Sequence, residues 1–352
     1  MNQRTDKVSW SATLAFGAPA IGAGYMYLIL SLYVMKFSTD VLLIAPAVMG
    51  AIFSLSRIWD AISDPLAGYL SDRTTFRLGR RRTWILCSCI PISIGFYAVF
   101  APPFSLQGSE LTLWMTIAII GFYSAMTLFF VPHMALGAEL STDYHERSRL
   151  FGVRHIFYTL GSILSLGAMY LLINEEFAEG GNVRLLARDL AFIAIGVMAV
   201  LVIYAVVYLR ERPEFQNRQQ GGPLRAFRDI WGNPHARLLI TVTFIENVGS
   251  AAIAALTLYI AQYVVGAPAM APLIILAYMV PSSLFVPIWI PLSKRYGKIK
   301  VWMAGLVLTG LSFGGMFFLP FIESIDHRLF LIMFLAAFAG LANGCGGTLG
   351  PS

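Results

Sequence analysis

Long apolar segments run through the whole chain, and they restrict its fold more than any other feature. Ten of them can be delimited, and all exceed the roughly 18 residues that mark a membrane span. A backbone in lipid must satisfy its hydrogen bonds internally, so segments of this length are predicted to be helices. The predicted helices cover residues 9–36, 44–70, 84–102, 111–136, 152–173, 187–209, 238–263, 268–292, 301–321 and 328–350.

The charge content supports a lipid-embedded protein. Only 12% of the residues are charged, about half of what a soluble domain carries. The net charge of +6 does not indicate nucleic acid as a partner, because the basic residues lie mainly in the loops between apolar segments. The sequence thus predicts an all-α membrane protein whose first partner is the lipid bilayer.

The motifs of soluble enzymes and of metal centres are not found in the sequence. It has no phosphate-binding Walker loop, no paired-histidine zinc motif and no Gly-x-Ser-x-Gly elbow. Its three cysteines, Cys87, Cys89 and Cys345, lie in apolar stretches and indicate neither a disulfide framework nor a metal set. We therefore expect no enzymatic activity and no cofactor.

The basic residues predict the orientation. Twenty lie on the side of the predicted helices that holds the N-terminus, and four lie on the opposite side. Cytoplasmic loops are enriched in Lys and Arg, so the N-terminus is predicted to be cytoplasmic. The expected location is the plasma membrane, as in a bacterial inner membrane.

A long polar loop divides the predicted helices into two halves. Residues 210–237 are broken by Gly-Gly-Pro at 221–223 and are predicted to be a cytoplasmic linker. It separates an N-terminal six-helix half, 1–209, from a C-terminal part of four helices, 238–352. Each half has a tight basic loop after its second helix, which is typical of a parallel internal repeat, although any short cytoplasmic loop tends to be basic.

Two acids interrupt the second apolar segment. Asp60 and Asp64 are one helical turn apart and share a face. A charge at membrane depth costs roughly 2.5–3.5 kcal/mol or more, so two carboxylates there need a cation, a proton or a partner. One alternative is a structural pairing of Asp60 with Arg57, one turn earlier.

The same region carries a family resemblance. The sequence RIWDAISDPLAG at 57–68, followed by SDRT at 71–74 and GRRR at 79–82, resembles the glycoside–pentoside–hexuronide:cation symporter family of the major facilitator superfamily. Two further stretches, TDVL at 39–42 and VPHMALGAEL at 131–140, are similar to it. The resemblance implies a major facilitator fold of twelve helices, of which ten are present here. It therefore suggests a C-terminally truncated chain, with a natural ten-helix protein as the alternative.

The resemblance implies roles for several oxygen-bearing side chains. Asp60 and Asp64 match the family's cation-binding acids, and Thr127 matches a threonine near that site. Ser63 stands where melibiose permease-like members commonly carry asparagine, which leaves open whether Na⁺ or H⁺ is the coupling ion. Alternatively, the Thr127 hydroxyl bonds a carbonyl of its own helix.

The resemblance does not carry the sugar contacts over. Sugar-binding members have an acid in the first span and another in the fourth, but residues 9–35 contain none, and Phe130 stands at the fourth-span position. Other candidates along the substrate path are Arg57 and the intramembrane acid Glu246 with its neighbour Asn247. Tyr25 and Tyr27 are further candidates, with ordinary packing as the alternative.

Charged residues near the predicted cytoplasmic ends form a candidate gate, with a solvated basic loop as the alternative. They are Asp72, Arg73, Gly79, Arg80, Arg81, Glu139, Arg147, Arg149 and Arg154.

The sequence as a whole predicts a monomeric, cation-coupled symporter of a small solute, with a sugar or glycoside as the first expectation. Two alternatives remain: a transporter of lysolipid or another amphipathic solute, and a truncated family member that does not transport.

Overall fold

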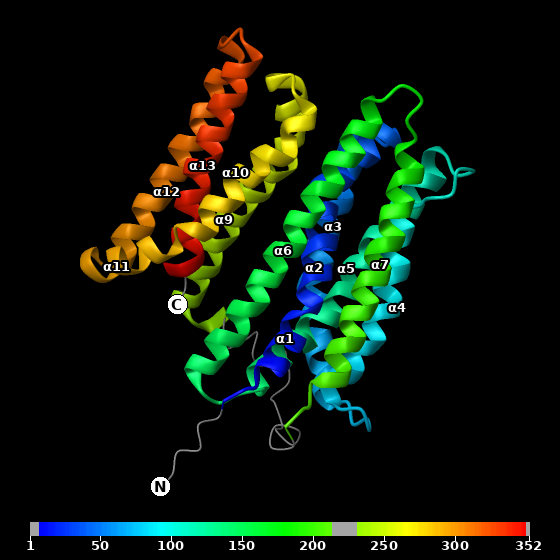
Figure 1. The fold of residues 1–352 in the computed structure, drawn as a ribbon, viewed down its shortest axis with the longest axis vertical. Coiled ribbons are helices and arrows are strands. Elements are labelled where there is room, and N and C mark those ends of the chain that lie inside the picture. Colours follow the sequence, from blue (N-terminus) through cyan, green and yellow to red (C-terminus); the bar gives the residue numbers. More distant parts are fainter. Residues whose placement is uncertain (1–6, 213–230, 350–352) are drawn as a thin grey trace. The chain divides into compact units, whose positions relative to one another are not determined.

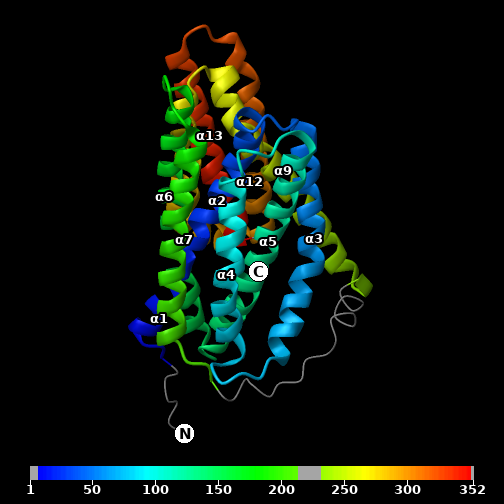
Figure 2. The ribbon, with the colours of Figure 1, turned by 90° about the vertical axis from the view of Figure 1, so that its right-hand side faces the viewer.

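The computed structural model describes residues 7–212 and 231–349, and every regular element within them is helical (Figures 1 and 2). The residues group into two compact units, 1–165 with 178–237, and 166–177 with 238–352. The assignment of 1–209 and 238–352 as repeated halves stays a prediction. Residues 213–230 of the predicted linker lie outside the described part.

The first unit is a bundle of long helices. The elements that contribute to it are α1 (Trp10–Gly17), α2 (Pro19–Lys36), the π-helical turn η1 (Phe37–Val41), α3 (Pro46–Arg73), α4 (Arg80–Phe100), α5 (Gly108–Glu139), α6 (Tyr144–Phe177) as far as residue 165, and α7 (Val183–Tyr208).

The second unit has shorter and more interrupted helices. Besides residues 166–177, it contains α9 (Pro234–Tyr259) from residue 238 onward, η3 (Ile260–Val265), η4 (Pro268–Met270), α10 (Ala271–Leu284), α11 (Val286–Tyr296), α12 (Lys298–Gly315), η5 (Met316–Phe321) and α13 (Ile325–Leu349).

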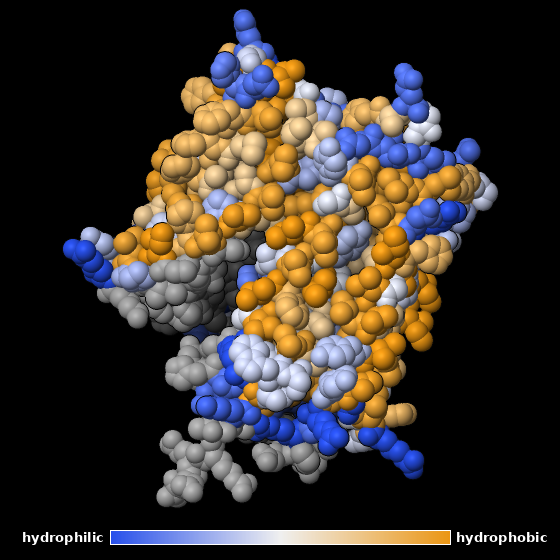
Figure 3. All heavy atoms as spheres, viewed as in Figure 1, coloured by the Kyte–Doolittle hydropathy of each residue, from blue (hydrophilic) through white to orange (hydrophobic). Residues whose placement is uncertain are grey.

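The predicted helical class is confirmed, since each of the ten predicted segments coincides with one to three of these helices. Seven stretches of the described residues are long and apolar enough to cross a membrane, so the protein is a multi-pass membrane protein. Hydrophobic side chains run along the helices, and hydrophilic ones gather near helix ends (Figure 3). The 28-residue α3 is not among the seven, because its charged residues lower its mean hydropathy.

Proline positions explain two breaks that the apolar pattern did not predict. The segment predicted as one helix over 9–36 breaks at Ala18, before Pro19, and the segment over 268–292 breaks at Phe285, before Pro287. Proline has no N–H to donate to the preceding turn and is tolerated in the first turn of a helix. Side-chain caps begin two other helices: Ser9 Oγ accepts from the amide of Ala12, and Asn182 Oδ1 accepts from that of Leu185.

The first unit is held together by apolar packing around α4 and α5. The helix α4 packs against α5 and α7, α3 packs against α5, and α2 packs against α7. Phe96 and Phe100 of α4 and Phe122 of α5 are fully buried in this core, with ring centroids 4.9 and 5.5 Å from Phe96. This packing fixes the faces of α3 and α5 that carry the polar residues described below.

Glycine allows α2 and α6 to approach each other backbone to backbone. A Cβ atom added at Gly161 would lie 1.9 Å from the carbonyl oxygen of Ile21, and one at Gly24 would lie 2.2 Å from that of Tyr158. Neither carbonyl belongs to a flexible side chain, so any larger residue has to separate the helices.

Gly161→Ala is expected to destabilise the first unit by roughly 1–3 kcal/mol, the usual cost of overpacking a close contact. The readout is the apparent melting temperature of the purified protein in detergent. Gly152→Ala is the matched control on the same helix: nothing lies within 4 Å of its added Cβ atom, and alanine favours a helix over glycine. Equal melting temperatures for Gly161→Ala and the wild type would contradict the backbone contact.

Candidate functional site

The candidate cation site lies on α3. Asp60 and Asp64 face the same side of this helix, with Asp60 only 20% exposed and Asp64 exposed within the described chain. The two carboxylates are not equivalent, because each has a different partner.

Asp64 is held by a neighbouring helix. The hydroxyl of Thr127, which is 7% exposed on α5, donates a hydrogen bond of 2.8 Å to Asp64 Oδ1. The Thr127 hydroxyl therefore reaches across to α3 instead of bonding a carbonyl of α5. Packing of α3 against α5 brings these two residues together across 63 positions of sequence.

Asp60 is paired on its own helix. Arg57 Nη1 lies 3.0 Å from Asp60 Oδ2, one turn earlier on α3. The other oxygen, Oδ1, is shielded from solvent and accepts no hydrogen bond from the described residues. Ser63, between the two acids, points its hydroxyl at the Asp60 carbonyl of the same helix, 3.4 Å away. The serine side chain is thus nearby but is not aimed at either carboxylate.

A backbone oxygen adds to this set. Pro65 lies inside α3 and has no N–H, so the carbonyl of Ala61 loses its normal helical donor. That carbonyl lies between Asp60 and Asp64 in the sequence. Carboxylate, hydroxyl and carbonyl oxygens are the ligands that hard cations prefer, so this stretch of α3 with Thr127 could hold a monovalent cation.

Aromatic rings surround Arg57. Its guanidinium lies 4.2 Å from the ring centre of Tyr123, and its Nη1 donates to the hydroxyl of Tyr27 over 3.1 Å. The contact with Tyr27 joins α2 to α3. Sequence reasoning did not single out Tyr123, although it precedes Thr127 by one turn and so shares its face of α5.

The other predicted substrate-path residues are placed as follows. Phe130 makes an edge contact with Tyr27, with ring centres 6.2 Å apart, and the guanidinium of Arg154 lies 5.9 Å from the Phe130 ring centre. Tyr25 is half-buried on α2. Glu246 and Asn247 lie in α9, but their side chains are outside the described part of the chain.

A second polar cluster lies where α3 ends and α4 begins. Arg80 and Arg81, which are 6% and 3% exposed, both contact Glu139 Oε1, at 2.7 and 3.3 Å. Arg81 is also ion-paired with Asp72 and donates to the hydroxyl of Ser71 over 2.7 Å. This ion network, made of Asp72, Arg80, Arg81 and Glu139, joins the ends of α3, α4 and α5 within the first unit.

Glu211, which sequence reasoning did not single out, caps the start of α4. Its carboxylate accepts from the backbone amides of Arg80, Arg81 and Arg82 over 2.7–2.8 Å. These are amides that the first turn of a helix leaves without partners, and the helix dipole favours a negative charge there. Gly79 allows the approach, since its φ is +119° and an added Cβ atom would lie 2.5 Å from a Glu211 oxygen.

The remaining predicted gate residues contact other groups. Arg149 pairs with Glu146 at 2.8 Å, and Arg147 Nε donates to the carbonyl of Ser141 over 2.7 Å. The guanidinium of Arg73 lies 4.0 Å from the ring centre of Tyr69. Arg154 has the Phe130 contact given above. The structure therefore brings four of the predicted gate residues together in the ion network and leaves these four apart from it.

Comparison with known proteins identifies the family to which the chain is similar. The model of a family described as "MFS/sugar transport protein" matches residues 15–350. The chain is 26% identical over 309 residues to "Inner membrane symporter YicJ" of Escherichia coli (strain K12), covering 86% of this chain and 65% of that protein. It is 26% identical over 307 residues to "Isoprimeverose transporter" of Lactiplantibacillus pentosus, covering 86% and 63%. The chain thus spans less than two thirds of either relative.

A solved structure agrees on the fold. The chain is similar to the crystal structure of a mutant of the nucleoside transporter NupG, with a TM-score of 0.71 and 16% sequence identity. The match covers 96% of this chain and 81% of that one. At this identity the likeness concerns the fold alone, and together with the family match it confirms the predicted major facilitator fold.

Proposed function

The chain belongs to the MFS/sugar transport protein family, and from this premise we propose that it is a cation-coupled symporter of a small solute. The observation that carries the proposal is the arrangement of Asp60 and Asp64. They lie one turn apart on α3, within the second predicted membrane helix; Thr127 donates to the second acid, and the first keeps a shielded oxygen that has no donor among the described residues. Such a set is costly in lipid unless a cation or a proton neutralises it.

The proposed mechanism assigns one role to each group. Asp60, Asp64 and the carbonyl of Ala61 bind Na⁺, or the two carboxylates accept H⁺, while Thr127 holds the Asp64 carboxylate in position. Loading neutralises the acids, so binding of the cation favours the conformations in which the site is closed to water. The halves of the transporter then expose the site to alternate sides of the membrane, as in other transporters built from repeats.

The proposed topology follows the charge distribution. With 20 basic residues on the N-terminal side and 4 on the other, the N-terminus is cytoplasmic and the membrane is the bacterial inner membrane. The ion network then lies at the cytoplasmic end of the first unit, where it would act as part of the gate.

The proposed cargo is a sugar or glycoside. Tyr27, Tyr123 and Phe130 offer ring faces and edges beside Arg57. Aromatic rings pack against the apolar faces of sugars, and a guanidinium donates to ring and hydroxyl oxygens. The name of the Lactiplantibacillus relative supplies the first solute to test.

The protein reconstituted in liposomes is expected to accumulate radiolabelled isoprimeverose up to about tenfold above the level reached without a gradient when a tenfold inward Na⁺ or H⁺ gradient is imposed. The driving force of a tenfold cation gradient is about 1.4 kcal/mol, enough for that difference at steady state. An ionophore that collapses the gradient is the control. Equal uptake with and without each of the two gradients would contradict cation coupling.

A second candidate is transport of an amphipathic solute such as a lysolipid. It is favoured by the lack of any acid on α1 and α2 from Ser9 to Met35 and by Phe130 on α5, because sugar hydroxyls would find few carboxylate acceptors there. Lysophosphatidylcholine in the same uptake assay separates the two candidates: saturable, gradient-driven uptake of this lipid but not of the sugar supports the second.

A further inference from the structure

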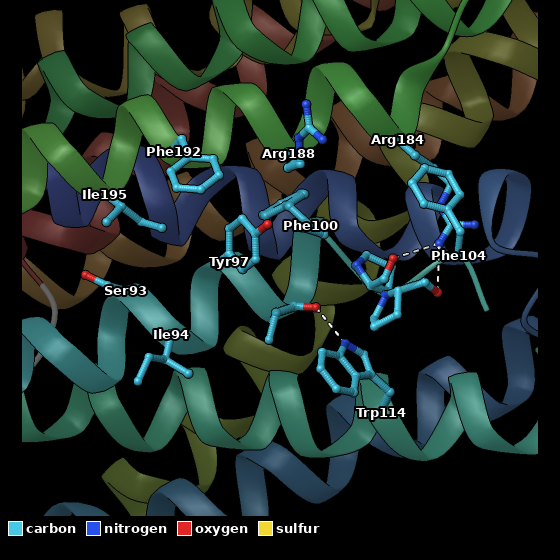
Figure 4. A pocket seen from close by; sticks show the side chains of 14 residues that line it. Ser93, Ile94, Tyr97, Phe100, Phe104, Trp114, Arg184, Arg188, Phe192 and Ile195 are labelled. Carbon is cyan, nitrogen blue, oxygen red and sulfur yellow. Dashed lines mark hydrogen bonds between the residues drawn. The ribbon is translucent and has the colours of Figure 1, made fainter. Parts of the chain in front are cut away.

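A pocket of about 670 Å³ lies on the first unit between α4, α5 and α7, away from the candidate cation site in sequence and in its lining (Figure 4). Its walls are mostly apolar, and residues of the loop after α4 line one end. Its lining includes Ile94, Trp114, Arg184, Arg188, Phe192 and Ile195.

The pocket opens onto the apolar outside of the bundle. Ile94 of α4 is 65% exposed and Phe192 of α7 is 58% exposed, although both belong to helices long enough to cross the membrane. Exposed apolar side chains at the middle of such helices contact acyl chains, so this pocket is a groove open to lipid.

The groove has a cationic end and an apolar end. Arg184 and Arg188 lie in the first two turns of α7, next to the loop that follows α4, whereas Ile195 lies three turns further along (Figure 4). From Arg184 to Ile195 the helix rises roughly 16 Å, about half of the ~30 Å hydrocarbon core and thus the depth of one leaflet. The indole of Trp114, a residue typical of the membrane interface, is fixed by a 2.9 Å hydrogen bond to the carbonyl of Ala98.

The two arginines keep unused donors. Arg184 donates through Nη2 to the carbonyls of Pro102 and Pro103, and its guanidinium lies 4.1 Å from the ring centre of Phe104. Its Nε is shielded from solvent and donates to no described residue. Arg188 pairs with Asp189 at 2.8 Å, but Asp189 is 60% exposed, and ion pairs this open to solvent contribute little.

We propose that this groove binds an anionic phospholipid of the leaflet opposite the cytoplasm, with its phosphate at Arg184 and Arg188 and an acyl chain along Ile94, Phe192 and Ile195. The two ends of the groove match the two parts of the lipid. The guanidinium groups lie where the phosphate would be, at the membrane interface, and the apolar part lies below them, where an acyl chain would be. The proposed leaflet follows from the predicted topology, while the lipid chemistry follows from the groove.

The experiment is native mass spectrometry of the purified, delipidated protein, supplied with equal amounts of palmitoyl-oleoyl phosphatidylglycerol and palmitoyl-oleoyl phosphatidylcholine. Each arginine near a membrane surface favours an anionic lipid about fivefold, so the first bound lipid should favour phosphatidylglycerol by roughly 25-fold. Arg184→Gln with Arg188→Gln should reduce that ratio at least about tenfold. Arg188→Gln alone, which keeps the contacts of Arg184 with the loop, should reduce it about fivefold.

Two control variants test whether the effect depends on these two arginines and on the shape of the groove. Arg328→Gln changes another arginine that donates to backbone carbonyls, those of Ile322 and Val264, and it should leave the ratio unchanged. Ile94→Trp narrows the groove and keeps both arginines, so it should reduce lipid retention. Equal binding of the two lipids, an equal loss in Arg328→Gln, or displacement by glycerol 3-phosphate at the same concentration would each overturn the proposal.

Discussion

Replacing Asp64 by asparagine is expected to lower the initial rate of gradient-driven solute uptake on the order of 100-fold while leaving the protein folded. A contact to a charged group contributes roughly 1.5–3 kcal/mol, which at its upper end corresponds to that factor in rate. Asparagine keeps an oxygen for the 2.8 Å hydrogen bond from Thr127, so the contact between α3 and α5 survives. Uptake into liposomes under an imposed Na⁺ or H⁺ gradient measures the loss.

Asp326→Asn serves as the control, since Asp326 is an exposed acid in the first turn of α13. Asp60→Asn should act like Asp64→Asn, but it also removes the charge that pairs with Arg57 at 3.0 Å. The double variant Asp60→Asn with Arg57→Gln separates the two roles. If that variant regained wild-type uptake, Asp60 would serve only as the partner of Arg57, and its place in the cation site would be refuted.

Glu139→Gln is expected to destabilise the first unit by about 3 kcal/mol. Glu139 is the shared acceptor of Arg80 and Arg81, and all three side chains are at least 85% shielded from solvent. Removing one member of a buried ion pair costs roughly 3–5 kcal/mol, because the remaining charges stay buried without compensation. For a unit of this size the apparent melting temperature should fall by roughly 6–12 °C.

Glu110→Gln is the matched control, because Glu110 is an exposed glutamate in the first turn of the same helix, α5. Its melting temperature should stay within about a degree of the wild type, as is usual for surface substitutions. If Glu139→Gln also had the melting temperature of the wild type, the ion pair of Arg81 with Asp72 would be sufficient without Glu139, and the ion network would not stabilise the bundle.

The helical framework could be predicted because it depends on local properties. Apolar length and the absence of water leave helices as the only solution, and the predicted segments coincide with helices throughout. Helical breaks at Ala18 and Phe285 were missed because apolar runs continue across them, and only the prolines that follow indicate a stop. The shared face of Asp60 and Asp64 is likewise a local property, set by a spacing of four.

Contacts between distant segments could not be read from spacing. Glu211 meets the amides of α4 across 129 to 131 positions, and nothing near Glu211 in the sequence indicates that destination. Tyr123 under Arg57 depends in the same way on the packing of α3 against α5. Ser63 stays a predicted cation ligand; its hydroxyl is directed to the carbonyl of Asp60 in its own turn, an orientation that its position beside the acids did not indicate.

The cap formed by Glu211 has a mechanical consequence. Glu211 lies just after α7, at the start of the connection to the second unit, and it binds the amides of Arg80 and Arg81, whose side chains hold Glu139 and Asp72. A displacement of Glu211 therefore weakens the cap on the first turn of α4 and, through Arg80 and Arg81, disturbs the ion network. One carboxylate and two arginines thus join the segment after α7 to the ends of α3, α4 and α5.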